Sequence, residues 1–214
     1  MLDNERDGVN ELTNILHNGD LPDTLDLGSI VAIDCETMGL NLYRDRLCLV
    51  QLSGGDGIAH MVQIVAGQDS APNLCKLLAN EKILKVFHFG RFDIAALLKT
   101  FGVLTSPVYC TKIASKIART YTDRHGLKNL LSEILDVDIS KQQQSSDWGA
   151  KHLSKAQIEY AATDVLYLHA LRKKLNEMLT RENRSELANE CFKFLPSRAV
   201  LDIKGWNDID IFEH

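Results

Sequence analysis

The sequence predicts an α/β fold in which a mixed sheet is covered by helices. Short apolar stretches with strand character occupy the first part of the chain. Segments with helical periodicity then alternate with further strand-like stretches, and glycine or proline separates many of them. Strands followed by alternating helices and strands are typical of a mixed sheet with helices on its faces.

The length favours one domain. The chain has 214 residues, of which 45% are hydrophobic, an ordinary content for a globular protein with a sizeable core. We expect a single domain over residues 1–214, with its core over about 28–182. A C-terminal helix and a tail over 183–214 complete it. The apolar side chains of this tail predict that it docks, either on its own core or on another subunit.

Three strands open the predicted sheet. They cover residues 30–36, 47–53 and 58–65, each rich in valine, isoleucine and leucine. The connection between the first two is short, so we expect these strands to be antiparallel neighbours.

The middle of the chain adds helices and two more strands. Pro72 is suited to the first turn of a helix, and Gly102 is a natural stop for another. In order, the expected elements are a helix from Pro72 to Ala79, a strand over 82–89, a helix from about Arg91 to Phe101, a short strand over 108–110 and a helix carrying Lys112, Lys116 and Arg119.

The last third is predicted to be helical. Residues 126–135 have helical periodicity, and the polar residues 140–148 are typical of a loop. Ser154 and Gln157 form a capping-box pattern, which predicts a long helix from Ser154 to about Glu182. A final helical segment is expected to end at Pro196.

Composition excludes several function classes. A net charge of −5 and a pI near 5.8 argue against tight, non-specific binding of long nucleic acid. No apolar run approaches the roughly 18 residues that span a bilayer, so no membrane partner is expected. The five cysteines are scattered, with no paired spacing, which is typical of reduced thiols in a cytoplasmic protein.

Two carboxylates end the first strand. Asp34 and Glu36 are two residues apart, so their side chains point to the same face. Like charges this close cost free energy unless a proton or a cation lies between them. The pattern therefore fits half of a metal site, although a solvated strand end is the ordinary interpretation of a lone D-x-E. Cys35 points to the opposite face and is interpreted as a core residue.

The other half of such a site has two candidates. Asp93 follows a strand and lies in the first turns of a helix, where the helix dipole alone would favour an acid. Tyr160 and Asp164 are four residues apart on one helical face among apolar neighbours. A buried acid needs a partner or a metal. A hydrogen bond between Tyr160 and Asp164 would supply such a partner without any metal.

The combination of these motifs is specific. The D-x-E pair, the Asp93 junction and the Y-x-x-x-D helix resemble the DEDD superfamily of 3′→5′ exonucleases, in the subclass with a tyrosine. The resemblance covers about residues 31–171 and implies a ribonuclease H-like fold. S-D-W at 146–148 is similar to the ribonuclease D branch.

A narrower resemblance is to the nanoRNase C group of short ribonuclease D-like proteins. The stretches D-C-E-T-M-G-L-N, H-F-G-R-F-D, T-Y-T-D-R-H-G-L-K, S-K-Q-Q-Q-S-S-D-W and F-L-P-S-R-A carry it. Phe89-Gly90-Arg91 departs from the His-Asn-Ala pattern of longer ribonuclease D proteins, and the chain ends soon after the nuclease domain. Both departures point away from tRNA processing.

The resemblance implies two divalent cations, Mg²⁺ or Mn²⁺, held by acidic residues. Asp34 would bridge both cations, Glu36 and Asp164 would hold the one on the water side, and Asp93 would support the other. Tyr160 would orient the attacking water. Oxygen ligands suit these hard cations.

Further residues are candidates for substrate binding. In related oligoribonucleases a leucine at the place of Leu40 separates the last two bases, although a core leucine is the ordinary alternative. The basic residues over 119–128 could hold a 5′-phosphate or the strand, or could equally form a solvated helix face and loop. The full set of candidates is Thr37, Met38, Gly39, Leu40, His88, Arg91, Arg124, His125, Gln144, Ser146 and Trp148.

The implied activity is hydrolysis of very short RNA, chiefly diribonucleotides, from the 3′ end to 5′-mononucleotides. The resemblance also implies a homo-oligomer, an octamer. One alternative is a general ribonuclease D-like 3′-5′ exonuclease acting on longer RNA or DNA ends. Another is a catalytically silent nucleic-acid-binding scaffold, but such a protein would be expected to lack at least one of the four acids or the tyrosine.

Overall fold

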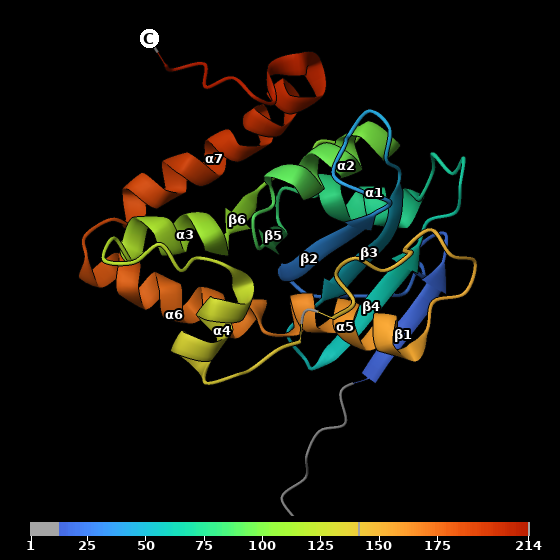
Figure 1. Cartoon of the computed structure of the whole chain (residues 1–214), viewed down its shortest axis with the longest axis horizontal. Helices are drawn as coiled ribbons and strands as arrows, with labels where there is room; N and C mark the ends of the chain where they lie inside the picture. Colours follow the sequence, from blue (N-terminus) through green and yellow to red (C-terminus); the bar gives the residue numbers. More distant parts are fainter. Residues whose placement is uncertain (1–12, 141, 214) are drawn as a thin grey trace, which may run out of the picture.

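A mixed sheet forms the centre of the molecule in the computed structural model, which describes residues 13–140 and 142–213 (Figure 1). Its strand order is β1-β4-β3-β2-β5-β6. The strands are β1 (Thr13–Asn18), β2 (Ile30–Thr37), β3 (Leu47–Ser53), β4 (Ile58–Gln63), β5 (Leu84–Phe87) and β6 (Val108–Cys110). The first twelve residues of the predicted domain lie outside the described part.

The central strands have the expected directions. β2 is antiparallel to β3, as the short connection predicts, and β3 is antiparallel to β4. β1 is parallel to β4, and β5 and β6 are parallel to β2 and to each other. β3 is buried along its whole length, and β2 is buried over most of its residues before its carboxyl end.

Helices cover both faces of this sheet, and further helices pack together beside its edge strand β6. They are α1 (Pro72–Ala79), α2 (Arg91–Phe101), α3 (Thr111–Ala118), α4 (Leu127–Leu135), α5 (Lys155–Leu166), α6 (Leu168–Arg181) and α7 (Ser185–Leu201), followed by the turn η1 (Asp202–Trp206). α5 lies across β2, β3 and β4, whereas α3, α6 and α7 pack together beside β6 (Figure 1). Among the described residues, no helix is long and apolar enough to cross a membrane.

The structure differs from the prediction in three places. β1 is an additional strand, whose polar sequence T-N-I-L-H-N lacks the strong apolar signal of a central strand. The long helix predicted from Ser154 to about Glu182 is divided at Tyr167 into α5 and α6. α7 does not end at Pro196 but continues to Leu201, because Leu195, Pro196 and Ala199 are buried against the core. Burial of this face compensates for the hydrogen bond that proline removes.

Candidate metal centre

Five predicted residues line one cavity. This cavity, of about 780 Å³, lies between the carboxyl end of β2, the start of α2 and one side of α5. Asp34, Glu36, Asp93, Tyr160 and Asp164 all contribute to its wall. Residues that lie far apart in the sequence therefore meet in one cavity, as expected if the three motifs form a single site.

β2 presents its two acids on the face that α5 covers. Asp34 lies opposite Gln51 of β3 in the sheet register, and Glu36 lies opposite Leu49. The pairing becomes irregular between Glu36 and Thr37, where the strand leaves the sheet. Such an irregularity bends a strand, and here it directs the following residues over the cavity.

Asp93 reaches the cavity through a tight junction between β5 and α2. Phe89 has a left-handed φ of 63°, and Gly90 follows it as the residue that caps α2. A Cβ atom on Gly90 would lie 2.5 Å from Cβ of Phe87, so no other residue fits without a shift. The junction buries the Asp93 side chain in the first turn of the helix.

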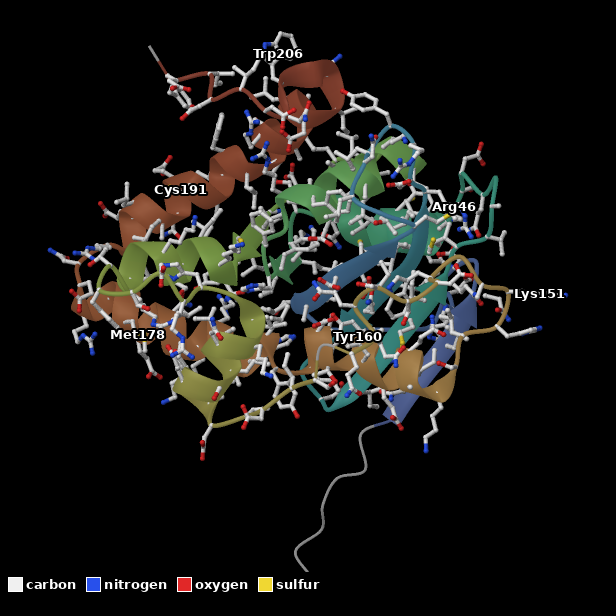
Figure 2. All side chains as sticks on the ribbon, viewed as in Figure 1. Arg46, Lys151, Tyr160, Met178, Cys191 and Trp206 are labelled. Atoms are coloured by element: carbon white, nitrogen blue, oxygen red, sulfur yellow. The ribbon has the colours of Figure 1, made fainter. Side chains whose placement is uncertain are left out.

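α5 supplies Tyr160 and Asp164, and its start is firmly fixed. Ser154 and Gln157 form the predicted capping box. The Gln157 side chain also donates to the carbonyl of Asp147, which ties the S-D-W segment to the helix. Trp148 packs beside Tyr160, with ring centroids 6.0 Å apart. Tyr160 lies on α5 in front of the sheet (Figure 2).

The acids are close enough to perturb one another. Oxygen atoms of Asp34, Glu36 and Asp164 lie within 4.8 Å of one another. Burial raises the pKa of Asp34 well above its usual range, and repulsion from Asp93, Asp164 and Glu36 adds to this. Burial and the neighbouring aspartates raise the pKa of Glu36 to about 9. Burial, opposed in part by hydrogen bonds, raises the pKa of Asp93 to about 7.

This donor set fits hard divalent cations. Clustered, buried carboxylates are costly to ionise, and a cation between them removes that cost. All the clustered ligands are carboxylate oxygens, which Mg²⁺ and Mn²⁺ prefer, and the cavity leaves room for water or substrate.

Most of the predicted substrate-binding residues also line this cavity. They are Thr37, Met38, Gly39, Leu40, His88, Gln144, Ser146 and Trp148. Leu40 is 86% exposed, so it is not the core leucine of the alternative interpretation. The imidazole of His88 is hydrogen-bonded to the hydroxyl of Thr111 at 2.9 Å.

Three predicted substrate-binding residues lie elsewhere. Arg91 forms a bidentate ion pair with Asp202 and is not part of the cavity wall. Arg124 pairs with Glu133 on the surface, and His125 is buried against Ser115, 2.9 Å from its hydroxyl. Within one chain, these three residues therefore lie outside the wall of the cavity, and their predicted contact with substrate stays a prediction.

Lys128, from the predicted basic stretch, also lines the wall. Other residues of the wall were not among the candidates, and they are Phe89, Phe92, Lys112, Gly126, Leu127, Ile139, Ser140 and Ser145. Lys112 lies over the ring of Phe89, 3.6 Å from its centroid. The departure of Phe89 from the ribonuclease D pattern was a sequence signal that could have marked it as a residue of the site. The positions of Gly126 and Ile139 in the cavity wall depend on tertiary packing, which no local pattern indicates.

Cys35 also has a role that its sequence context does not reveal. It is buried, as a core residue should be. Its main-chain N–H and its thiol, however, both donate to Asp93 and partly offset the effect of burial on the pKa of that acid. Cys35 therefore connects β2 directly to the second acidic motif.

Comparison with known proteins identifies similar chains. A family model described as 3′-5′ exonuclease matches residues 6–180. The structure of Brucella melitensis NrnC bound to pGG is 58% identical, with a TM-score of 0.92, and the match covers 95% of this chain and 99% of that one. The structure of the same protein with bound Mg²⁺ is also 58% identical, with a TM-score of 0.91, and covers 94% and 99%.

A curated relative is longer than this chain. Ribonuclease D of Acidiphilium cryptum is 38% identical over 170 residues, which are 79% of this chain but only 43% of the relative. The similar structures confirm the predicted α/β fold with its mixed sheet, and they confirm the resemblance to the nanoRNase C group.

Proposed function

The chain belongs to the 3′-5′ exonuclease family and to its NrnC branch, and from this premise we propose that it hydrolyses very short RNA to 5′-mononucleotides. The convergence of Asp34, Glu36 and Asp164 within 4.8 Å, in a cavity that also holds Asp93 and Tyr160, carries the proposal. The match to the pGG-bound neighbour supports short RNA as the substrate.

The acids would hold two divalent cations. Asp34 is repelled by all three other acids and is the candidate to bind both cations, with Glu36 and Asp164 as candidates for one cation and Asp93 for the other. The Mg²⁺-bound neighbour supports this choice of metal. When bound, such cations neutralise phosphate charge and lower the pKa of water.

The protein's own groups orient the reaction. The Tyr160 hydroxyl is hydrogen-bonded to Asp164, and burial raises the pKa of the phenol, so it acts as an orienting hydrogen-bond group and not as a base at neutral pH. Leu40 projects from the cavity rim as an apolar surface against which bases can pack. His88, Lys112 and Lys128 line the cavity and are candidates to meet phosphate or sugar oxygens.

The cavity shape supports a preference for diribonucleotides. One wall of the cavity is formed by residues at the start of α4 and by polar and apolar residues of the loop that follows it, namely Gly126, Leu127, Ile139, Ser140, Gln144, Ser145 and Ser146. A wall at this position would limit how many nucleotides fit behind the scissile phosphate. The net charge of −5 agrees with a short substrate, because a long one is usually held along a basic track.

A timed digestion tests this proposal. RNAs from dinucleotide to decamer, labelled at the 5′ end, are incubated with Mg²⁺ or Mn²⁺, with Asp164→Ala as the control. We expect the dinucleotide to disappear far faster than longer chains. Shortening of long chains with accumulation of dinucleotides would instead support a general 3′ exonuclease, the activity suggested by similarity to ribonuclease D. Binding without cleavage would support a silent scaffold.

We also propose a homo-oligomer, an octamer as the resemblance implies, in the cytoplasm. Trp206, Ile209 and Phe212 of the tail are exposed and apolar, which supports a contact with another subunit. The five cysteines are free thiols, as expected for a cytoplasmic protein. Light scattering coupled to size-exclusion chromatography, on the wild type and on Phe212→Ser, measures the assembly.

A further inference from the structure

The C-terminal turn contacts two segments that shape the cavity. η1 and the end of α7 lie beside α2 and beside the loop between β2 and β3 (Figure 1). Trp206, at the end of η1, is labelled at this corner of the molecule (Figure 2). The loop carries Leu40, and α2 carries Asp93 two residues after Arg91.

Asp202 is the centre of these contacts. Its side chain is 5% exposed. Arg91 donates from Nε to Oδ2 at 2.6 Å and from Nη2 to Oδ1 at 2.7 Å. Arg198 of α7 approaches Oδ1 to 3.0 Å. A carboxylate held by two guanidinium groups, one of them bidentate, has a strongly fixed position.

Tyr43 connects the loop to the same turn. Its hydroxyl lies 3.3 Å from the carbonyl oxygen of Asp202 and 3.2 Å from that of Ile203, to which it donates. Within the loop, Asp45 N–H donates to the Asn41 carbonyl at 2.8 Å and the Asp45 carboxylate accepts from Asn41 N–H at 3.0 Å. These bonds close the loop between Asn41 and Asp45, with Tyr43 inside the closed part and Leu40 directly before it.

The position of Leu40 needs such an anchor. Its side chain is 86% exposed, so packing in the core does not fix it. The loop faces α2 and the tail across a cavity of about 560 Å³, lined by Leu40, Tyr43, Arg91 and Asp202 among others. Lys99 of α2 also donates to the Leu42 carbonyl, so removal of the bonds to η1 should loosen the loop next to this space without releasing it.

We propose that Asp202 and Tyr43 are positioning residues that fix the Leu40 loop relative to the start of α2. Neither residue lines the cavity that holds the acids, so both act through the segments they anchor. The effect on substrate binding rests on the proposed function, whereas the effect on the loop does not.

Hydrogen exchange followed by mass spectrometry tests the anchor directly. In Tyr43→Phe and in Asp202→Asn, we expect faster exchange over residues 38–46 and unchanged exchange in β4. Asp210→Asn is the matched control, since Asp210 is exposed in the same tail and accepts from Phe212 N–H. Tyr43→Phe removes one exposed hydroxyl and keeps the fold, so it remains informative if Asp202→Asn does not fold. Unchanged exchange over residues 38–46 in Tyr43→Phe would overturn the proposal.

Kinetics on a diribonucleotide give the second measurement. KM should rise about fivefold in Tyr43→Phe with little change in kcat, the size expected from loss of one neutral hydrogen bond. In a Leu40→Ala background the same substitution should have little further effect, because the anchor acts through Leu40. An equal effect in both backgrounds would overturn this role. Faster loop exchange in a protein whose wild type cleaves no RNA would uphold the anchor and refute the proposed function.

Discussion

The hydroxyl of Tyr160 is hydrogen-bonded to the carboxylate of Asp164, one helical turn further along α5. Burial raises the pKa of the phenol above its usual value of 10.0, and repulsion from the nearby acids and this bond add to the effect. A neutral phenol beside a metal-binding acid is suited to orienting water. The bond also fixes the orientation of Asp164.

The Tyr160→Phe variant should therefore lose catalytic activity but still bind metal. We expect kcat to fall by about 10²- to 10⁴-fold, the usual contribution of a positioned proton-transfer or orienting group. Mn²⁺ binding, measured by calorimetry, should change little, because all the acids remain. Tyr109→Phe is the matched control, since Tyr109 is buried but its hydroxyl has no partner among the described residues. Equal losses in the two variants would contradict the role of Tyr160.

Asp34→Asn should stabilise the metal-free protein. Asp34 is surrounded by Asp93, Asp164 and Glu36, so its ionised form is unfavourable in the folded state. We expect an increase in Tm of roughly 2–4 °C, which corresponds to about 1 kcal/mol in a chain of this size. Mg²⁺ should raise the Tm of the wild type and not that of the variant. A lower Tm for the metal-free variant would show that the acids do not repel one another.

The stability of the metal-free protein should fall as pH rises. Glu36 and Asp93 have pKa values of about 9 and about 7 in the fold, against ordinary values of 4.5 and 3.8. Between the ordinary and the raised pKa values, the folded state binds more protons than the unfolded state. The stability that these two protonated acids contribute is therefore fully present at low pH and is lost as pH rises through their folded pKa values of about 7 and about 9. Mg²⁺ competes with these protons and should stabilise more at high pH.

Thermal melts in EDTA and in Mg²⁺ across this pH range measure both effects. Asp34→Asn, which lacks one of the repelling acids, should show a weaker dependence on pH. Metal-free stability that increases with pH throughout the same window would contradict the assigned pKa directions.

Gln51→Met should also stabilise the protein. Gln51 lies opposite Asp34 in the sheet, is fully buried, and has no partner for either amide atom among the described residues. Removing an unsatisfied buried amide while keeping its volume should add about 1 kcal/mol. Gln63→Met is the control and should destabilise, because the Gln63 amide donates to the carbonyls of Ala150 and Lys151. A similar fall in Tm for both variants would show that Gln51 has a partner in solution.

The sequence predicted those parts of the fold that local patterns determine. The apolar runs of β2 and β3 and the capping box of α5 are short-range signals, and the structure has each of them. β1 was missed because an edge strand needs fewer apolar residues than a central one. The division at Tyr167 and the passage of α7 through Pro196 depend on packing, which local propensity does not describe.

The candidate site shows the same division. Asp34 and Glu36 could be paired from their spacing alone, and Asp93, Tyr160 and Asp164 from a specific resemblance. Arg91 was a candidate because it lies two residues from Asp93, whereas the structure pairs it with Asp202, which is 111 residues away. A side chain's neighbour in sequence predicts its position only when the local backbone, and no distant charge, determines where it points.

Digestion of pGG in water enriched in oxygen-18, followed by mass spectrometry, tests the central claim most directly. Hydrolysis by a water bound at the acidic cavity predicts one labelled oxygen in the 5′-phosphate of half of the mononucleotide product, since the other half keeps its original phosphate. The label should depend on Mg²⁺ and be absent with Asp34→Asn. Label in a 3′-phosphate, or cleavage that persists in EDTA, would contradict a metal-dependent 3′-5′ exonuclease that releases 5′-mononucleotides.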